Sequence, residues 1–246
     1  MKKFTILLLL LCTFASVKSQ QLSLGVDLFN RYIWRGLDLG GKSPSIQPYA
    51  SVKFGNETHA LSVGTWGAFS VAGTSNEEVD LYLNYSYKSM VNIMVTDYFF
   101  PGLNQGARDK YFEWNSDSTG HVLEATASFA GTENFPFTAL FAMNFYGNDA
   151  RKASGDLFMS KYVEIGYKRK IDAIDLNVFA GAALDNPDSS AGETGYYLNE
   201  NAGIINLGVK LAKTVAITDK FSLPMQCTLS ANPGLGKVYI AMGITF

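Results

Sequence analysis

In the stretch 22-LSLGVDLFNRYIWRG-36, apolar and polar residues alternate. One parity is apolar, and the other carries Asp27, Arg31 and Arg35. Side chains of a β-strand point alternately to opposite faces, so this stretch predicts a strand with one apolar and one polar face. The apolar parity comprises Leu22, Leu24, Val26, Leu28, Tyr32 and Trp34. This pattern fits a soluble sheet with a core, or a membrane barrel with lipid outside and a polar lumen.

The same alternation recurs to the end of the chain. It predicts about twelve strands, an even number as in single-chain bacterial barrels. The segment 135–146 is apolar on both parities, so its facing is left open. The predicted strands are 22–36, 45–54, 59–71, 79–88, 91–98, 122–129, 135–146, 162–168, 176–184, 205–211, 221–231 and 238–246.

The connections between these strands alternate between long and short. The longest are 101–120 and 186–203, whereas Gly55-Asn56-Glu57-Thr58 forms a tight turn. Outer-membrane barrels sort their connections in this way, with short turns in the periplasm and long loops outside. Aromatic residues near the predicted strand ends indicate interfacial girdles: Tyr32, Trp34, Tyr85, Tyr87, Phe99 and Tyr167. We therefore predict an all-β, closed antiparallel transmembrane barrel.

The first residues have the order of a secretory signal peptide. Lys2 and Lys3 precede an apolar run, 4–14, and small residues follow up to Ser19. We expect cleavage after Ser19, so that 1–19 is removed and 20–246 forms a single barrel domain. The apolar run is shorter than the roughly 20 residues of a transmembrane helix.

Composition excludes several functions. The chain has 20 Lys and Arg against 22 Asp and Glu and no basic block, so no nucleic-acid partner is expected. Cys227 is the only cysteine left after cleavage, which rules out an intramolecular disulfide. We find no metal-ligand cluster and no cofactor fingerprint, and we expect no cofactor.

The last predicted strand ends the chain on Phe246. Apolar residues occupy every second position, and a terminal phenylalanine resembles the recognition signal of the barrel-assembly machinery, which we expect as a partner during biogenesis. An apolar edge left open would promote aggregation. We therefore predict that this strand pairs with the first one and closes the barrel.

Three short motifs add a family resemblance. Arg31-Tyr32-Ile33-Trp34-Arg35-Gly36 resembles the Arg-Tyr-x-x-Arg-Gly opening of the TorF-type porin family of Gram-negative outer membranes, although Asn30 stands where a serine often precedes that motif. The segment Tyr162–Tyr167 and the pair Asn232-Pro233 also look like that family. The resemblance implies an outer-membrane barrel and no particular substrate.

If the apolar parity faces lipid, charged side chains enter the lumen. Their signs nearly cancel, which predicts weak ion selectivity. In one interpretation they pair across the barrel and plug it; in the other, Arg31 and Arg35 line a constriction opposite Glu124 or Glu164. The candidates are Asp27, Arg31, Arg35, Lys53, Asp80, Glu124, Glu164, Lys168 and Lys210, with Lys88 and Asp185 as further members.

The predicted function is an outer-membrane porin for passive diffusion of small hydrophilic solutes, with outer-membrane lipid as its surroundings. A plugged barrel that binds a partner through 101–120 and 186–203 is the alternative. An outer-membrane lipase is a third, with His121 as its only candidate base, but we expect no serine or carboxylate beside it and no enzyme activity. Asp97 lies on the lipid parity, which predicts either a place at the rim or a bulge.

Overall fold

A computed structural model describes residues 20–72, 77–101 and 106–246. Within them, twelve strands form one closed antiparallel barrel, in which β1 pairs with both β4 and β14. The predicted fold class is therefore confirmed, while the predicted signal peptide lies outside the described residues. None of the described helices is long and apolar enough to cross a membrane.

The strand bounds follow the predicted segments closely, apart from the first and from β12, which extends seven residues beyond the predicted end at Leu211. A separate two-stranded sheet, β2 and β3, lies in the connection between β1 and β4. Two short 3-10 helices, η1 (Gly106–Asp109) and η2 (Ser189–Ala191), lie in the two longest loops. The strands are β1 (Gln20–Phe29), β2 (Ile33–Trp34), β3 (Leu37–Asp38), β4 (Ser45–Gly55), β5 (His59–Ser70), β6 (Glu78–Tyr87), β7 (Val91–Phe99), β8 (His121–Phe129), β9 (Phe137–Gly147), β10 (Lys161–Ile171), β11 (Ile174–Ala183), β12 (Gly203–Thr218), β13 (Phe221–Asn232) and β14 (Lys237–Thr245).

The two faces of the wall differ in polarity, as the alternation requires. Leu22 and Leu24 are 64% and 65% exposed on the outer face. Other exposed apolar residues on that face include Val63, Leu83, Ile93, Ile165, Val178, Val209, Leu229 and Ile240. Buried polar residues of the inner face include Gln47, Asp80, Thr96, Glu124, Thr126, Asn206, Ser230 and Asn232. A soluble protein rarely leaves so wide an apolar surface uncovered.

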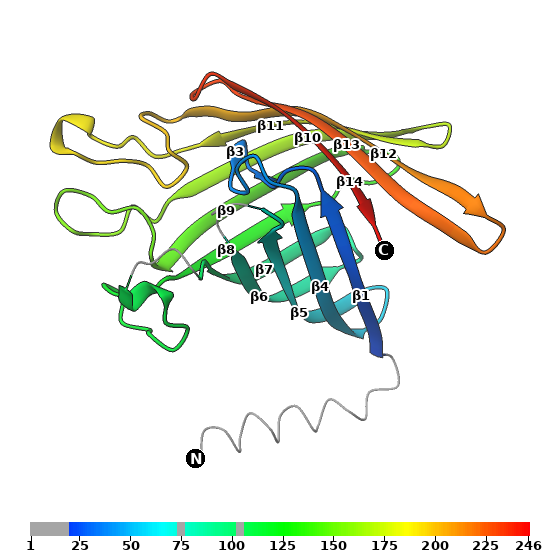
Figure 1. The fold of residues 1–246 in the computed structure, drawn as a ribbon, viewed down its shortest axis with the longest axis horizontal. Helices are drawn as coiled ribbons and strands as arrows, with labels where there is room; N and C mark the ends of the chain where they lie inside the picture. The colour runs from blue at the N-terminus through cyan, green and yellow to red at the C-terminus, as the bar shows by residue number, and fades with distance from the viewer. Residues whose placement is uncertain (1–19, 73–76, 102–105) are drawn as a thin grey trace, which may run out of the picture.

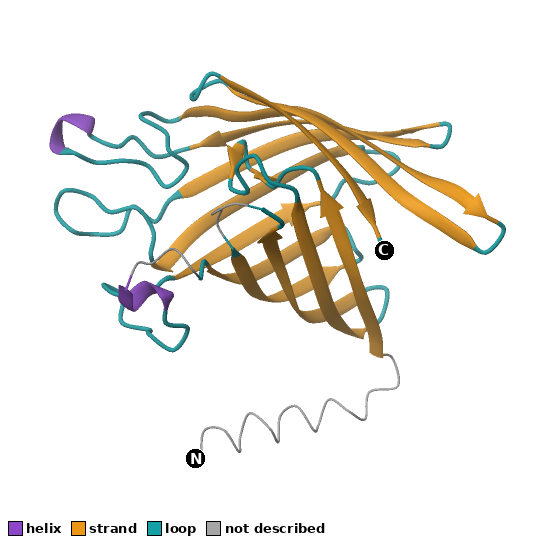
Figure 2. Cartoon of the chain, viewed as in Figure 1, coloured by secondary structure: helices purple, strands orange, loops and turns teal. Residues whose placement is uncertain are grey.

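The long loops gather at one end of the barrel, which we call the loop end, and the tight turns at the other, the turn end. Figure 2 shows the long teal loops and both purple helices together on one side. The turn end contains, for example, the two-residue turn between β10 and β11. The long and short connections are thus sorted as the sequence predicts.

The first strand is shorter than predicted. β1 ends at Phe29, and the segment 30–44, which we call the hairpin segment, leaves the wall and enters the lumen. The prediction of one strand over 22–36 is therefore wrong in its second half. The alternation breaks at Asn30, a polar residue on the apolar parity.

The barrel closes where predicted, through a short seam. Asp27, Leu28 and Phe29 are the register partners of Thr245, Ile244 and Gly243. The Phe246 N–H donates to the Val26 carbonyl at 2.9 Å, and the Val26 N–H donates back at 3.0 Å.

Asn30 extends this seam beyond the strand. Its side chain accepts a hydrogen bond from the Met242 N–H at 2.7 Å and donates to the Ile240 carbonyl at 3.2 Å. These bonds pair backbone groups of β14 beyond the end of β1, so they lengthen the closure.

Two register shifts change which side chains face inward. The β8–β9 register passes over Phe145, which explains why the parity of 135–146 is ambiguous. The β11–β12 register passes over Ile205, which is buried although the sequence pattern predicts it to face lipid. Bulges commonly redirect a side chain in this way.

Candidate luminal site

The hairpin segment folds around a tight turn at Arg35 and Gly36. Both residues have positive φ, 48° and 79°, and they connect the paired strands β2 and β3. A two-residue turn with both central residues at positive φ is the type I′ arrangement, which suits the twist of a β-hairpin. Figure 1 shows this blue segment, labelled at β3, among the ribbons of the later strands.

The tip of the hairpin touches the backbone of the wall. A Cβ added to Gly36 would lie 2.0 Å from the Ile205 carbonyl oxygen, so only glycine permits this approach. Asn232 donates a side-chain hydrogen bond to the Gly36 carbonyl at 3.1 Å. The turn therefore contacts both β12, through Ile205, and β13, through Asn232.

Arg35 fixes the hairpin to the opposite part of the wall. Its guanidinium donates to both carboxylate oxygens of Glu124, at 2.5 and 2.9 Å, and to the Tyr197 hydroxyl at 2.9 Å. Glu124 is 0% exposed and the Arg35 side chain 11%. Burial is the largest influence on the Tyr197 phenol and raises its pKa, so this hydroxyl stays neutral beside the ion pair. The guanidinium also lies over the rings of Trp34 and Tyr162.

An apolar core forms around the hairpin inside the barrel. It comprises Leu37, Ala142, Tyr162, Ala183, Tyr197 and Ile205, with Trp34 and Leu39 packed against it. Trp34 stacks on Tyr197 with ring centroids 5.8 Å apart, and Tyr32 is buried against Trp66. The prediction that Tyr32 and Trp34 belong to an interfacial girdle is therefore wrong.

Arg31 has a different partner from Arg35. It forms an ion pair with Asp38 of the same hairpin at 3.3 Å, and both side chains remain partly exposed. The structure thus places Arg31 and Arg35 in the lumen but brings only Arg35 to Glu124.

The other predicted luminal residues occupy separate positions. Glu164 accepts hydrogen bonds from Tyr162 at 2.5 Å and Asn206 at 3.1 Å. Asp27 accepts from the Thr245 hydroxyl at 2.5 Å. Asp80 lies beside Glu78, which is hydrogen-bonded to Tyr32.

Two expected members lie elsewhere. Lys88 occupies the turn between β6 and β7, with its ammonium near the Tyr87 ring, and Asp185 lies in the loop after β11, paired with Lys161 at 2.8 Å. The expectation that these two residues lie on the luminal wall is therefore wrong, because neither belongs to a barrel strand.

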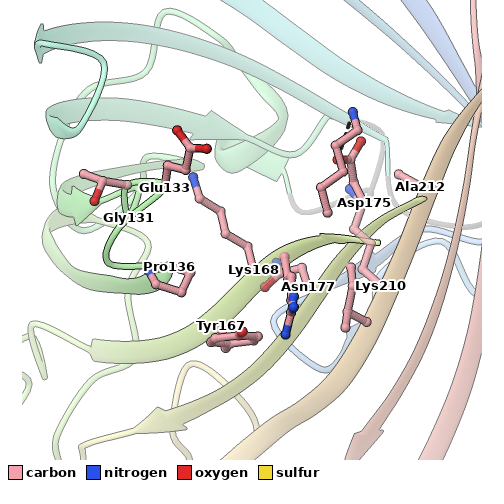
Figure 3. A pocket seen from close by; sticks show the side chains of 13 residues that line it. Gly131, Glu133, Pro136, Tyr167, Lys168, Asp175, Asn177, Lys210 and Ala212 are labelled. Atoms are coloured by element: carbon pink, nitrogen blue, oxygen red, sulfur yellow. Dashed lines mark ion pairs between the residues drawn. The ribbon is translucent and has the colours of Figure 1, made fainter. Parts of the chain in front are cut away.

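Two cavities lie in the lumen and at its turn end. One, of about 300 Å³, lies under the hairpin and is lined by Arg31, Arg35 and Lys210, with amide and hydroxyl side chains. The other, of about 920 Å³, is lined by Lys168, Asn177 and Lys210 among others (Figure 3). Among the described residues, no group of three His, Cys, Asp or Glu side chains is placed to hold a metal ion.

A second polar cluster lies on the outer wall, covered by the loop 106–120. Asp97 and His121 face outward on neighbouring strands, and the His121 Nδ1 lies 2.8 Å from Asp97. The Nε2 lies 2.7 Å from the Tyr111 carbonyl, and the Trp114 ring stacks on the imidazole at 3.8 Å.

This cluster corrects two expectations. A carboxylate does lie beside His121, and Phe99, expected in the girdle, is buried against this histidine, which is itself fully buried. Asp97 needs no bulge, because the β6–β7 register is continuous around it.

The comparison with protein families decides the membership of the chain. The model of a bacterial protein of unknown function, Gcw_chp, matches residues 15–204. The chain belongs to this family. No curated protein matches the chain. The match to Gcw_chp covers the hairpin segment and Glu124, so the ion pair that fixes the hairpin lies within the family region.

Solved structures of low sequence identity are similar to the Gcw_chp chain. The NanC porin is 10% identical, with 91% of this chain and 98% of that chain covered and a TM-score of 0.44. An outer membrane channel from Pseudomonas putida F1 is 11% identical, with 94% and 96% covered and a TM-score of 0.45. A chain from work on in-meso crystallization of membrane proteins is 6% identical, with 91% and 83% covered and a TM-score of 0.47.

The sequence pattern does not indicate several residues of the luminal site in this Gcw_chp protein. Tyr197 and Asn232 bind the hairpin, yet one lies in a loop and the other at a strand end, where sequence gives no facing. The available signal was Asn30, a polar residue where the alternation requires an apolar one, followed by Gly36, because glycine readily adopts the positive φ that a tight turn requires.

Proposed function

We propose that this Gcw_chp protein is an outer-membrane channel for small hydrophilic solutes. The observation that carries the proposal is the closed barrel with an apolar outer face and a polar lumen containing cavities. Lipid is the solvent that an exposed apolar wall requires, and closure removes the strand edges that lipid cannot satisfy. The long loops then lie outside the cell and the tight turns in the periplasm.

The hairpin segment sets the size limit of the proposed channel. Its apolar core and the Arg35–Glu124 pair occupy the loop end of the lumen, whereas the cavities lie below it. Arg35 and Glu124 are in direct contact and Glu124 is fully buried, so solutes would have to pass beside the pair and not between its members.

The proposed partners follow from the same surfaces. They are outer-membrane lipid around the wall, small polar solutes in the lumen, and the barrel-assembly machinery. This machinery would recognise β14 together with the terminal Phe246. The TorF-type porin resemblance supports a channel, and export by the signal peptide 1–19 belongs to the same proposal.

A closed barrel that binds a partner through its loops is the second candidate. The bidentate Arg35–Glu124 pair favours it, because an ion pair buried within an apolar core is difficult to open. In that case the hairpin is a permanent plug.

We assign no catalysis to the His121 cluster. Both ring nitrogens face oxygen acceptors, Asp97 and the Tyr111 carbonyl, so neither is free to take a proton from a nucleophile. A lipase would need a hydroxyl at one of them.

Current through a planar bilayer tests the channel. Purified protein that migrates as a heat-modifiable band should give discrete current steps. Folded protein without current would favour the plugged barrel, and protein that stays soluble without detergent would contradict the membrane assignment.

A further inference from the structure

Three donor side chains form a row across the luminal wall. Lys168 of β10 is the register partner of Asn177 of β11, which is the partner of Lys210 of β12. Directly paired residues on one face of a sheet have Cβ atoms about 5 Å apart, so both lysine stems flank the asparagine amide. Figure 3 shows the three side chains around one cavity.

Lys210 joins the two cavities. It lines the larger one together with Lys168 and Asn177, and the smaller one together with Arg31 and Arg35. The described lining of the smaller cavity contains no carboxylate. Cationic side chains therefore line both cavities, from the turn end up to the hairpin.

The acids nearest this row form no ion pair with its two lysines. The Asp175 carboxylate is 3.6 Å from the Lys170 ammonium, and the Asp27 carboxylate, which keeps its charge, accepts a hydrogen bond from the Thr245 hydroxyl. Glu133, at the rim, faces Lys168 in Figure 3, but in the described part of the chain no ion pair within 4 Å involves Lys168 or Lys210.

The polar groups of the row suit an anion. Each lysine ammonium is a donor only, and the Asn177 amide supplies two more N–H donors. The Asn177 side-chain oxygen is buried and has no hydrogen-bond partner among the described residues, and it lies on the side of Gly166 of β10. Ionised carboxylate and phosphate oxygens can only accept hydrogen bonds, so they match a row of donors. In pores, lysine side chains arranged around the lumen favour the passage of anions.

We propose that Lys168, Asn177 and Lys210 form an anion-binding station in the lumen, and that the channel passes small oxyanions in preference to cations. This inference rests on the proposed channel function and names its solute class. It departs from the weak selectivity that the charge count predicts, because Arg35 and Lys170 pair with Glu124 and Asp175, whereas the two lysines of the row form no ion pair within 4 Å among the described residues.

The reversal potential in a KCl gradient tests the station. For full-length protein in a planar bilayer, the reversal potential should have the sign of an anion-selective pore. In the double variant Lys168→Gln with Lys210→Gln, the reversal potential should move to zero or change sign. Glu133→Gln should move it further in the anion direction, and Lys220→Gln, in the exposed turn after β12, should leave it unchanged.

Competition with the chloride current distinguishes carboxylate from phosphate as the preferred oxyanion. Malonate or inorganic phosphate should reduce the chloride current of the wild type at lower concentration than in the double variant, and the more effective one names the preferred group. A cation-selective potential, a potential unmoved by the double variant, or no competition by either anion would overturn the station while leaving the channel. No current from folded protein would overturn the channel and the station together.

Discussion

Arg35 and Glu124, 89 positions apart in the chain, form a bidentate ion pair that joins the hairpin segment to β8 inside the barrel. Removing one partner leaves the other charge buried and unpaired, which costs about 3–5 kcal/mol. Arg35→Ala should therefore lower the urea concentration at which the folded, heat-modifiable form is lost.

Two variants make this prediction specific to burial. Arg31→Ala removes a partly exposed pair with Asp38 and should cost about 1 kcal/mol or less. The double variant Arg35→Met with Glu124→Leu should recover most of the lost stability, because no charge stays buried. Equal stability of Arg35→Ala and the wild type would contradict the buried pair.

Gly36→Ala should displace the hairpin. The new Cβ would meet the Ile205 carbonyl at 2.0 Å, and the backbone has φ of +79°. Gly192→Ala is the matched control, since its φ is +78° but nothing lies within 4 Å of the added Cβ. Trypsin should cleave after Arg31 or Arg35 faster in Gly36→Ala only; the same rate in both variants would show that the contact with Ile205 is unimportant.

Asp97→Asn and His121→Ala should release the loop 106–120 from the outer wall. His121 contacts Asp97 and the Tyr111 carbonyl and stacks on Trp114, so either change removes the centre of the contact. Limited trypsin digestion should cut after Lys110 faster in both variants. Cleavage after Lys152, in the loop between β9 and β10, serves as the internal control, and an unchanged ratio of the two cuts would contradict the proposed contact.

Asn30→Ala should weaken the seam between β1 and β14. The change removes two side-chain hydrogen bonds, to Met242 and Ile240, at a place where the paired register is only three residues long. The temperature at which the heat-modifiable band is lost should fall. Asn201→Ala, in an exposed loop position, should leave it unchanged, and equal temperatures for both variants would show that the backbone closes the seam unaided.

The sequence predicts the wall of this barrel well and the contents of the lumen poorly. Alternation of Leu22, Leu24 and Val26 with polar residues is a local property, so strand order, facing and closure follow from it. The hairpin segment depends on contacts between distant residues, such as Gly36 with Ile205 and Arg35 with Tyr197, which no local period records. The facing of Ile205 is not recorded by the local period either, because the β11–β12 register shift passes over this residue and turns its side chain into the lumen.

The single-channel conductance of Arg35→Ala relative to the wild type measures whether the hairpin segment narrows a conducting lumen. Both proteins are compared in one salt solution after each has been shown to be folded by heat-modifiable migration, with Gly192→Ala as a further control. If the hairpin narrows a channel, the wild type conducts, Gly192→Ala conducts equally, and Arg35→Ala conducts more. Equal conductance of Arg35→Ala and the wild type, or no current from any of the three, would contradict this account.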